Sequence, residues 1–321
     1  MEFSVINLSE QAFLSVNAPL LCFIFAANIF YACCLISDTE RLKQPLKLIL
    51  GSLVWFSVAY CVTLVLLCWL FKDVANYNVN IVSWGVVQYF VLSSMTSSVW
   101  LNFYYFLHIV PAQRALLVWL KRNIKSVTWT VLLFDSAFFL LCSAISTASG
   151  INNYSIYANG TWTDYWNDGL FNTEGVFIAI SRVHILFGLF VMMVSSFSTA
   201  HYLHRHIKSV AQGGGFSSTP RIQSQIRVTV SGIVQGVLYL IYVTFYLLDS
   251  ISLMGFLHFI LSGWISSTVT SLFLMVTTVN LGVGQTVFRQ KANQAFRALR
   301  TMCGVTDDVG KKQPTALSYR V

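Results

Sequence analysis

Long uninterrupted runs of apolar residues constrain this chain more than any other feature of its sequence. A helix needs about 20 mostly apolar residues to cross the ~30 Å hydrocarbon core of a bilayer. Seven runs reach that length: 13–36, 46–71, 81–110, 127–148, 176–200, 226–248 and 257–283. Only 10% of the residues are charged, against about 25% in a soluble domain. We therefore expect an all-α membrane protein, a seven-transmembrane helix bundle.

The basic residues fall almost entirely in alternate connections between these runs. Segments 37–47, 111–126, 201–227 and 285–321 hold 18 of the 20 Lys and Arg residues, and cytoplasmic segments collect such residues. The N-glycosylation sequons, at Asn7, Asn153 and Asn159, all lie on the other side. Both patterns predict an outside N-terminus and an inside C-terminus, with glycans at Asn153 and Asn159.

This orientation divides the chain into three parts. Residues 1–12 form an extracellular N-terminus and residues 13–283 the seven-transmembrane domain. Residues 284–321 form a cytoplasmic amphipathic helix and tail.

The sequence lacks the residues that several other functions require. The last run has no lysine for a retinal Schiff base, and no internal repeat indicates a secondary transporter. No Ser/His/acid set, carboxylate pair or metal-ligand cluster occurs in a fitting context, so we expect no enzyme, no cofactor and no metal site. The basic connections account for the net charge of +8, so no nucleic-acid partner is needed. A receptor is favoured.

The most specific motif lies between the third and fourth runs. It reads YYFLHI at 104–109 and LVWLKRNIK at 117–125. Shorter motifs are ANIF at 27–30, ERLKQPLKL at 40–48, RHIK at 205–208, LYLIY at 238–242 and KANQAF at 291–296. Together they resemble the bitter taste receptors (type 2 taste receptors), a family of G-protein-coupled receptors, and are most similar to the fish branch.

The resemblance implies a multi-pass chemosensory receptor of the plasma membrane. Such a receptor binds small bitter agonists from the extracellular side and activates a gustducin-like heterotrimeric G protein. A pheromone-type chemoreceptor is the alternative with a similar architecture, and a membrane transporter or channel is the alternative from another class. The family's helix-two arginine and its late helix-seven His-Ser pair have no counterparts here. If those groups hold the resting state, this chain must use others.

Arg182 lies inside the fifth run, roughly 9 Å below its outer end at 1.5 Å per residue. An arginine at that depth costs a few kcal/mol unless it is paired or faces water. Two hypotheses remain open. Arg182 is either a cationic anchor for an acidic or strongly polar ligand in an outward-opening pocket, or a structural partner of Asp135 in the fourth run.

Other candidate ligand-binding residues are polar and aromatic side chains in the outer halves of helices three, five, six and seven. Small-molecule sites combine apolar and aromatic walls with a few polar groups. The candidates are Trp84, Gln88, Tyr89, Phe177, Ser181, Tyr242, Tyr246, His258 and Ser262. Glu174 and Asp249 are interpreted as solvated charges at the rim.

The inner connections form a basic cytoplasmic face. Attraction to anionic lipid is worth about 1 kcal/mol for each basic residue near the surface. The resemblance adds G-protein docking as a role for this face. The residues expected to face the G protein are His108, Arg114, Lys121, Arg122, Lys125, Arg205, Lys208 and Arg227.

Overall fold

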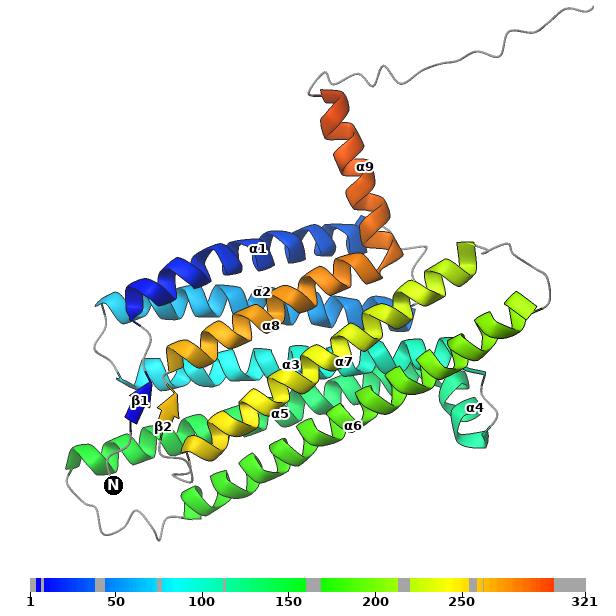
Figure 1. Ribbon diagram of the computed structural model, residues 1–321. Coiled ribbons are helices and arrows are strands. Elements are labelled where there is room, and N and C mark those ends of the chain that lie inside the picture. The colour runs from blue at the N-terminus through cyan, green and yellow to red at the C-terminus, as the bar shows by residue number, and fades with distance from the viewer. Residues whose placement is uncertain are drawn as a thin grey trace, which may run out of the picture.

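The computed structural model describes residues 4–6, 9–37, 44–73, 77–111, 114–159, 169–212, 220–253, 259–261 and 263–302. Within these residues seven long helices are formed, and they lie side by side in one bundle (Figure 1). They are α1 (Glu10–Ser37), α2 (Gln44–Asp73), α3 (Tyr77–Ile109), α5 (Ile124–Asn159), α6 (Gly169–Gln212), α7 (Pro220–Leu253) and α8 (Gly263–Gly284). The shorter elements are α4 (Ala115–Arg122), α9 (Thr286–Met302), β1 (Ser4–Ile6) and β2 (Phe259–Leu261).

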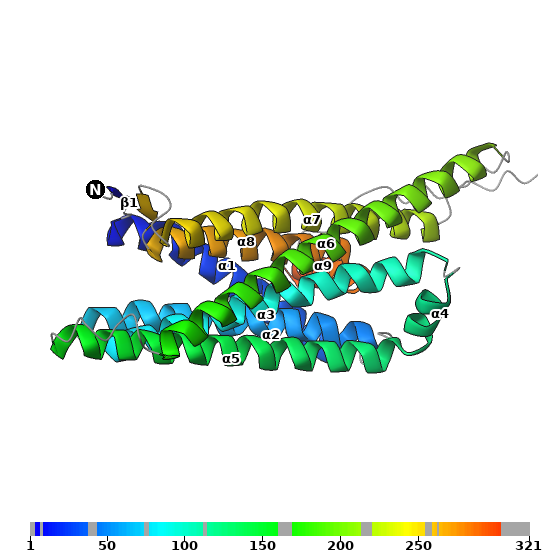
Figure 2. The same cartoon turned by 90° about the horizontal axis from the view of Figure 1, so that it is seen from below.

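The bundle has two layers. Figure 2 shows α2, α3 and α5 in one layer and α7 and α8 in the other, with α6 running obliquely between them. Helices suit these apolar sequences because each satisfies its own backbone hydrogen bonds, which lipid cannot do.

Successive long helices run in opposite directions, so the two ends of the bundle differ. β1, β2 and the start of α1 lie at one end, which we call the N-terminal end; α4 and α9 lie at the other (Figure 1). We call the second the basic end, because described Lys and Arg side chains gather there: Lys47, Arg114, Lys121, Arg122, Lys125, Arg205, Lys208, Arg227, Arg289, Lys291, Arg297 and Arg300.

The outward-facing surface of the bundle is apolar. Phe190 and Phe197 on α6 and Ile241 on α7 are 64%, 67% and 62% exposed. Apolar patches of this kind are rare on soluble monomers, whereas lipid tails are as apolar as the side chains themselves. In the described parts of the chain, six helices are long and apolar enough to cross a membrane: α1, α2, α5, α6, α7 and α8.

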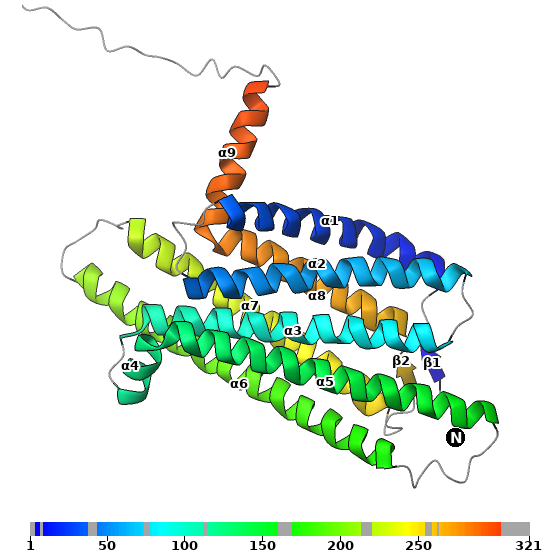
Figure 3. The ribbon, with the colours of Figure 1, turned by 180° about the vertical axis from the view of Figure 1, so that it is seen from behind.

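The third predicted run forms a long helix of a different composition. α3 has 33 residues and carries a buried polar cluster of Ser93, Ser94, Thr96, Ser97 and Ser98. It lies between α2 and α5 (Figure 3) and also contacts α6 and α7. Small polar residues allow membrane helices to approach closely, so α3 is polar where other helices cover it.

Two boundaries differ from the sequence-based prediction. The seventh run was expected from residue 257, but α8 begins at Gly263. Residues 259–261 instead form β2, which pairs in parallel with β1, Ser4 opposite Phe259. A short apolar run does not by itself distinguish a strand from a helix. In addition, α5 continues past the predicted end at residue 148, so Asn153 and Asn159 lie in its last turns and not in a loop.

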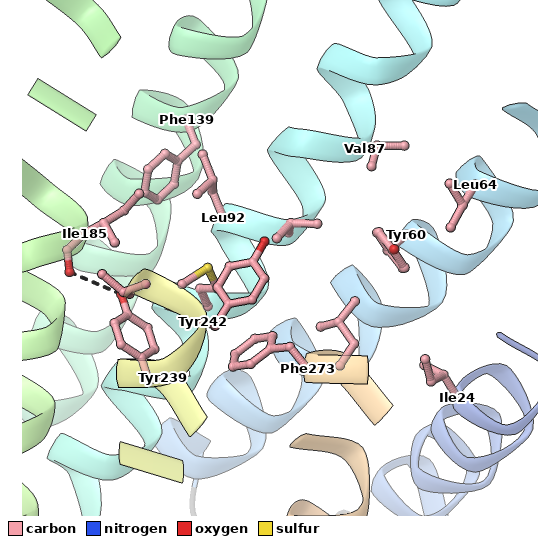
Figure 4. Close-up of a cluster of buried hydrophobic side chains, with 14 of the residues drawn as sticks. Ile24, Tyr60, Leu64, Val87, Leu92, Phe139, Ile185, Tyr239, Tyr242 and Phe273 are labelled. Carbon is pink, nitrogen blue, oxygen red and sulfur yellow. Dashed lines mark hydrogen bonds between the residues drawn. The ribbon is translucent and has the colours of Figure 1, made fainter. Parts of the chain in front are cut away.

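A large apolar core joins the layers in the middle of the bundle. It includes Tyr60, Phe139, Tyr239 and Phe273 (Figure 4). The Tyr60 hydroxyl lies 3.2 Å from the backbone oxygen of Ser267 and 3.0 Å from Ser271 Oγ, so this buried phenol is satisfied by α8.

A second apolar core lies at the basic end and joins α1, α2, α8 and α9. Its buried members include Tyr31, Leu50, Leu281 and Phe288. The rings of Tyr31 and Phe288 are stacked with their centroids 4.3 Å apart. Beyond Phe288, α9 turns away from the bundle and points outward from its side (Figure 1).

Candidate functional site

A cavity of about 650 Å³ opens between α3, α5, α6 and α7. Its walls come from the first half of α3, the second half of α5, the first half of α6 and the last turns of α7, so it lies at the N-terminal end of the bundle. The volume falls within the range of roughly 300–1,000 Å³ that is typical of small-molecule sites.

One stripe of α6 forms a wall of this cavity. Glu174, Phe177, Ile178, Ser181 and Arg182 all line it, and their spacing of three and four residues places them on one helix face. At 1.5 Å per residue, Arg182 lies about 12 Å farther along the axis than Glu174. The three candidates proposed for this helix therefore face one space.

The α3 wall contains the three candidates Trp84, Gln88 and Tyr89. The Tyr89 hydroxyl lies 2.7 Å from Ser136 Oγ on α5. Gln88 hydrogen-bonds the hydroxyl of Tyr246, which lines the cavity from α7. These contacts connect the candidates from α3 and α7 across the cavity.

Tyr242 does not line the cavity. Its side chain is buried in the core, where the hydroxyl lies 3.1 Å from Thr270 Oγ1 and the ring stacks on Phe273 at 4.6 Å between centroids. Tyr242 and Tyr246 do share a face of α7, but Tyr242 lies one turn deeper and is covered by α8. His258 and Ser262 lie outside the described residues.

The α5 wall was missed by the sequence analysis. Phe139, Cys142, Ser143 and Ser146 line the cavity at helical spacing. Ser143 Oγ donates to the backbone oxygen of Gly85 on α3 at 2.6 Å, a close approach that a side chain at position 85 would obstruct. The spacing of these α5 residues was the available signal, although serine in a membrane helix is just as typical of helix packing.

Three of the described residues that line the cavity carry charged side chains. Glu174 accepts a hydrogen bond from Ser146 Oγ, and Asp249 accepts one from Ser266 Oγ, both at 2.9 Å. Arg182 and Asp249 both act electrostatically on the Tyr246 hydroxyl. The two carboxylates interpreted as rim charges are therefore part of the cavity wall, together with the guanidinium of Arg182.

Asp135, considered above as a partner of Arg182, is bonded to other groups. It is 5% exposed, accepts a hydrogen bond from Trp100 Nε1 at 2.9 Å, and lies 3.0 Å from His184 Nε2. The three side chains connect α3, α5 and α6 in the interior. Within the described ranges, no group of three or more His, Cys, Asp or Glu side chains is arranged to hold a metal ion.

The residues expected to face a G protein lie at the basic end. His108 lies in the last turn of α3, with Nε2 2.6 Å from the Tyr104 hydroxyl. The others lie next to or on α4, at the start of α5, and on the facing ends of α6 and α7. A hollow of about 500 Å³ opens between the end of α3 and α6, lined by Val110, Pro111, Ser198, His201, Tyr202, Arg205 and His206. Of the predicted residues, Arg205 is the one that lines this hollow.

A polar network near the basic end was also missed. The Asn280 amide on α8 donates to the backbone oxygen of Ser231 at 2.9 Å and to Gln235 Oε1 at 3.0 Å, both on α7. Ser231 Oγ donates to Asn280 Oδ1 at 3.0 Å. Gln285 donates to the Tyr105 hydroxyl on α3. This network joins α7 to α8 and α3 to the end of α8.

Comparison with known proteins identifies a family. The family model described as taste receptor protein (TAS2R) matches residues 7–300. That range contains the cavity, the basic end and nearly all of α9. A search of curated proteins finds no match to the chain.

Proposed function

Because the chain belongs to the taste receptor (TAS2R) family, we propose that it is a bitter-sensing receptor of the plasma membrane. Members of this family are G-protein-coupled receptors and not enzymes, and the apolar helices make this chain a multi-pass membrane protein. In this proposal, small molecules bind from the extracellular side. The response is activation of a heterotrimeric G protein of the gustducin-like class.

The proposed topology has seven crossings: the six strongly apolar helices and α3, which corresponds to the predicted run 81–110. α3 runs along the bundle between α2 and α5 (Figure 3) and contacts α6 and α7. Basic residues gather at a single end, which supports a cytoplasmic basic end. The extracellular N-terminus then covers residues 1–12, the membrane domain 13–283, and the cytoplasmic helix and tail 284–321.

The ligand site that we propose is the cavity at the N-terminal end. The observation that carries this assignment is that seven candidate residues from three helices face one cavity of about 650 Å³, at the end opposite the basic residues. They are Trp84, Gln88, Tyr89, Phe177, Ser181, Arg182 and Tyr246.

Signalling requires that a ligand bind the active arrangement better than the resting one, because a ligand with equal affinity for both shifts nothing. We assign the conformational change between the resting and active arrangements to the basic ends of α6 and α7. Arg205 and Lys208 are exposed there on α6, and Arg227 is half-buried on α7. The hollow beside α3, which Arg205 lines, offers a protein partner a positively charged surface.

A calcium assay in cells that express the receptor tests this function. We expect compounds from a bitter panel to evoke calcium only when a gustducin-like alpha subunit is co-expressed. Trp84→Ala and Phe177→Ala should each raise the half-maximal concentration about tenfold or more at unchanged surface level, since each removes an aromatic wall. Trp55→Ala is the matched control, because Trp55 is 65% exposed on α2 and does not line the cavity.

Two results would count against the proposal. Ligand-evoked current without any alpha subunit would indicate a channel. Responses to pheromone-type compounds with none across the bitter panel would indicate the other chemoreceptor class.

Glycosylation tests the proposed orientation separately. We expect an endoglycosidase to shift the mobility of the native receptor, and the double variant Asn153→Gln/Asn159→Gln to lose that shift. A shift that persists in the double variant would contradict glycans at these residues.

A further inference from the structure

The charged groups around the cavity carry information on the charge of its ligand. Glu174, Asp249 and Arg182 are the charged side chains among the described residues that line it. Their formal charges leave one negative charge in excess. Pairing among the three redistributes this charge and does not cancel it, so the excess does not depend on which groups are paired.

The three serine hydroxyls among the described residues of the wall already donate their protons within the protein. Ser143 Oγ donates to the backbone oxygen of Gly85 at 2.6 Å, Ser181 Oγ to that of Ile178 at 2.8 Å, and Ser146 Oγ to Glu174 at 2.9 Å. A hydroxyl has one proton and two lone pairs. These hydroxyl oxygens can still accept hydrogen bonds from a ligand. A ligand with N–H donors therefore complements them.

The order of the charges along the cavity favours the same ligand. Glu174 lies near the start of α6 and Asp249 near the end of α7, both toward the end of the bundle, whereas Arg182 lies about 12 Å deeper than Glu174 along α6. An anion that approaches Arg182 passes two carboxylates first. A cation meets attraction at the mouth, where the two carboxylates lie, since a cleft entrance lined by one sign of charge concentrates the opposite ion.

Aromatic side chains complete a site for a cation. Trp84, Tyr89, Phe177 and Tyr246 line the cavity, and the faces of aromatic rings attract ammonium groups electrostatically.

We propose that this cavity selects small organic cations, protonated amines above all, over anions of the same size. The proposal rests on the proposed function in that it takes this cavity as the ligand site. It makes Glu174 and Asp249 the charge-selecting residues and gives Arg182 the opposite effect, in place of the role of anion anchor.

Cys142 allows the charge preference to be measured without knowing the agonist. It is a free cysteine on α5 that lines the cavity. Its thiolate attacks the sulfenyl sulfur of a methanethiosulfonate, forms a mixed disulfide and releases methanesulfinate with the electron pair. Reagents with a trimethylammonium tail and with a sulfonate tail then stand for the two classes of ligand.

The experiment measures the labelling rate of Cys142 by mass spectrometry in the full-length receptor, held in nanodiscs of zwitterionic lipid. Each rate is divided by the rate of the same reagent with a free thiol in solution. We expect the ammonium reagent to be favoured by roughly fivefold, the effect of one excess charge about 8 Å away in water. Raising the salt concentration should reduce the preference.

Four variants identify the source of the preference. Glu174→Gln and Asp249→Asn should each lower the ratio, and Arg182→Gln should raise it. Glu10→Gln is the control and should leave the ratio unchanged, because Glu10 is an exposed acid at the start of α1 that does not line the cavity.

The outcomes separate this proposal from the proposed function. A ratio of one or below in the native receptor overturns cation selection and leaves bitter signalling, which the calcium assay measures, unaffected. A preference that Glu174→Gln and Asp249→Asn both leave unchanged also overturns it. If neither reagent labels Cys142, water does not reach the cavity, and both the charge selection and the proposed ligand site are wrong.

Discussion

Asp135 is a buried acid in the middle of the bundle, with a hydrogen-bonding partner on each of two other helices. It bonds Trp100 and His184 from a buried position. Asp135→Ala removes their acceptor, and an unsatisfied buried donor costs about 1–3 kcal/mol. We expect a lower melting temperature in detergent and less receptor at the cell surface. Asp135→Asn keeps an acceptor oxygen and should recover part of the loss; equal melting of the two variants would show that the hydrogen bonds contribute little.

Gly232 on α7 makes a second prediction at this scale. A Cβ there would lie 2.5 Å from Asn102 Oδ1, and the Asn102 amide donates to Ser196 Oγ at 2.7 Å. Gly232→Ala should therefore destabilise the receptor by about 1–3 kcal/mol, as overpacking does elsewhere. Gly51→Ala is the control, because nothing lies within 4 Å of a Cβ at Gly51. Thermal unfolding checks both, and a Gly232→Ala receptor as stable as the control would refute the close approach.

At the scale of elements, the packing of α9 against the bundle is centred on the ring of Phe288. Phe288 is 1% exposed and stacked on Tyr31, whereas Phe296 on the same helix is 68% exposed. Phe288→Ala should cost about 3–5 kcal/mol and detach α9 from α1. We expect a lower melting temperature and faster amide hydrogen exchange in residues 286–302. Phe296→Ala removes the same ring from an exposed position and should change neither in detergent, so similar effects of the two variants would contradict this docking.

The sequence predicted the elements unevenly, for identifiable physical reasons. Apolar length predicted the long helices well because crossing lipid imposes it directly. The same criterion misjudged residues 259–261, whose three apolar side chains serve a strand. The same criterion also placed the end of α5 too early. The helix continues beyond residue 148 through residues that are too polar to be counted as part of a membrane span. Pairing with β1, far away in the chain, is not encoded in local hydrophobicity.

At the scale of the whole molecule, the cavity was predictable in part. Arg182 stood out because a charge inside an apolar run is costly, and its neighbours on α6 followed from helical spacing. Tyr242 lies outside the wall of this cavity because helical spacing gives a face of the helix and not the depth at which a neighbouring helix covers it. The α5 wall carried no charge, so Ser143 and Ser146 could not be told from packing residues before the helices were assembled.

At the scale of the whole molecule, the hydrogen bonds between α7 and α8 can stabilise the resting arrangement of the receptor. The Asn280 side chain makes three hydrogen bonds to Ser231 and Gln235 close to the basic end, where the family's His-Ser pair is absent. Each bond is worth about 1 kcal/mol, and about 1.4 kcal/mol changes an equilibrium tenfold. Asn280→Ala should therefore raise ligand-independent signalling several-fold at equal surface expression.

Asn17→Ala is the matched control for Asn280→Ala. Asn17 on α1 donates to Thr268 Oγ1 on α8 at 2.8 Å, so this variant also removes a buried amide that bonds α8, but at the N-terminal end. General destabilisation of the bundle would affect both variants alike. If the hydrogen bonds at the basic end hold the resting state specifically, basal calcium rises in Asn280→Ala alone. Equal basal signalling in the two variants would mean that the network stabilises the resting and active arrangements equally, because only hydrogen bonds that break on activation favour the resting state.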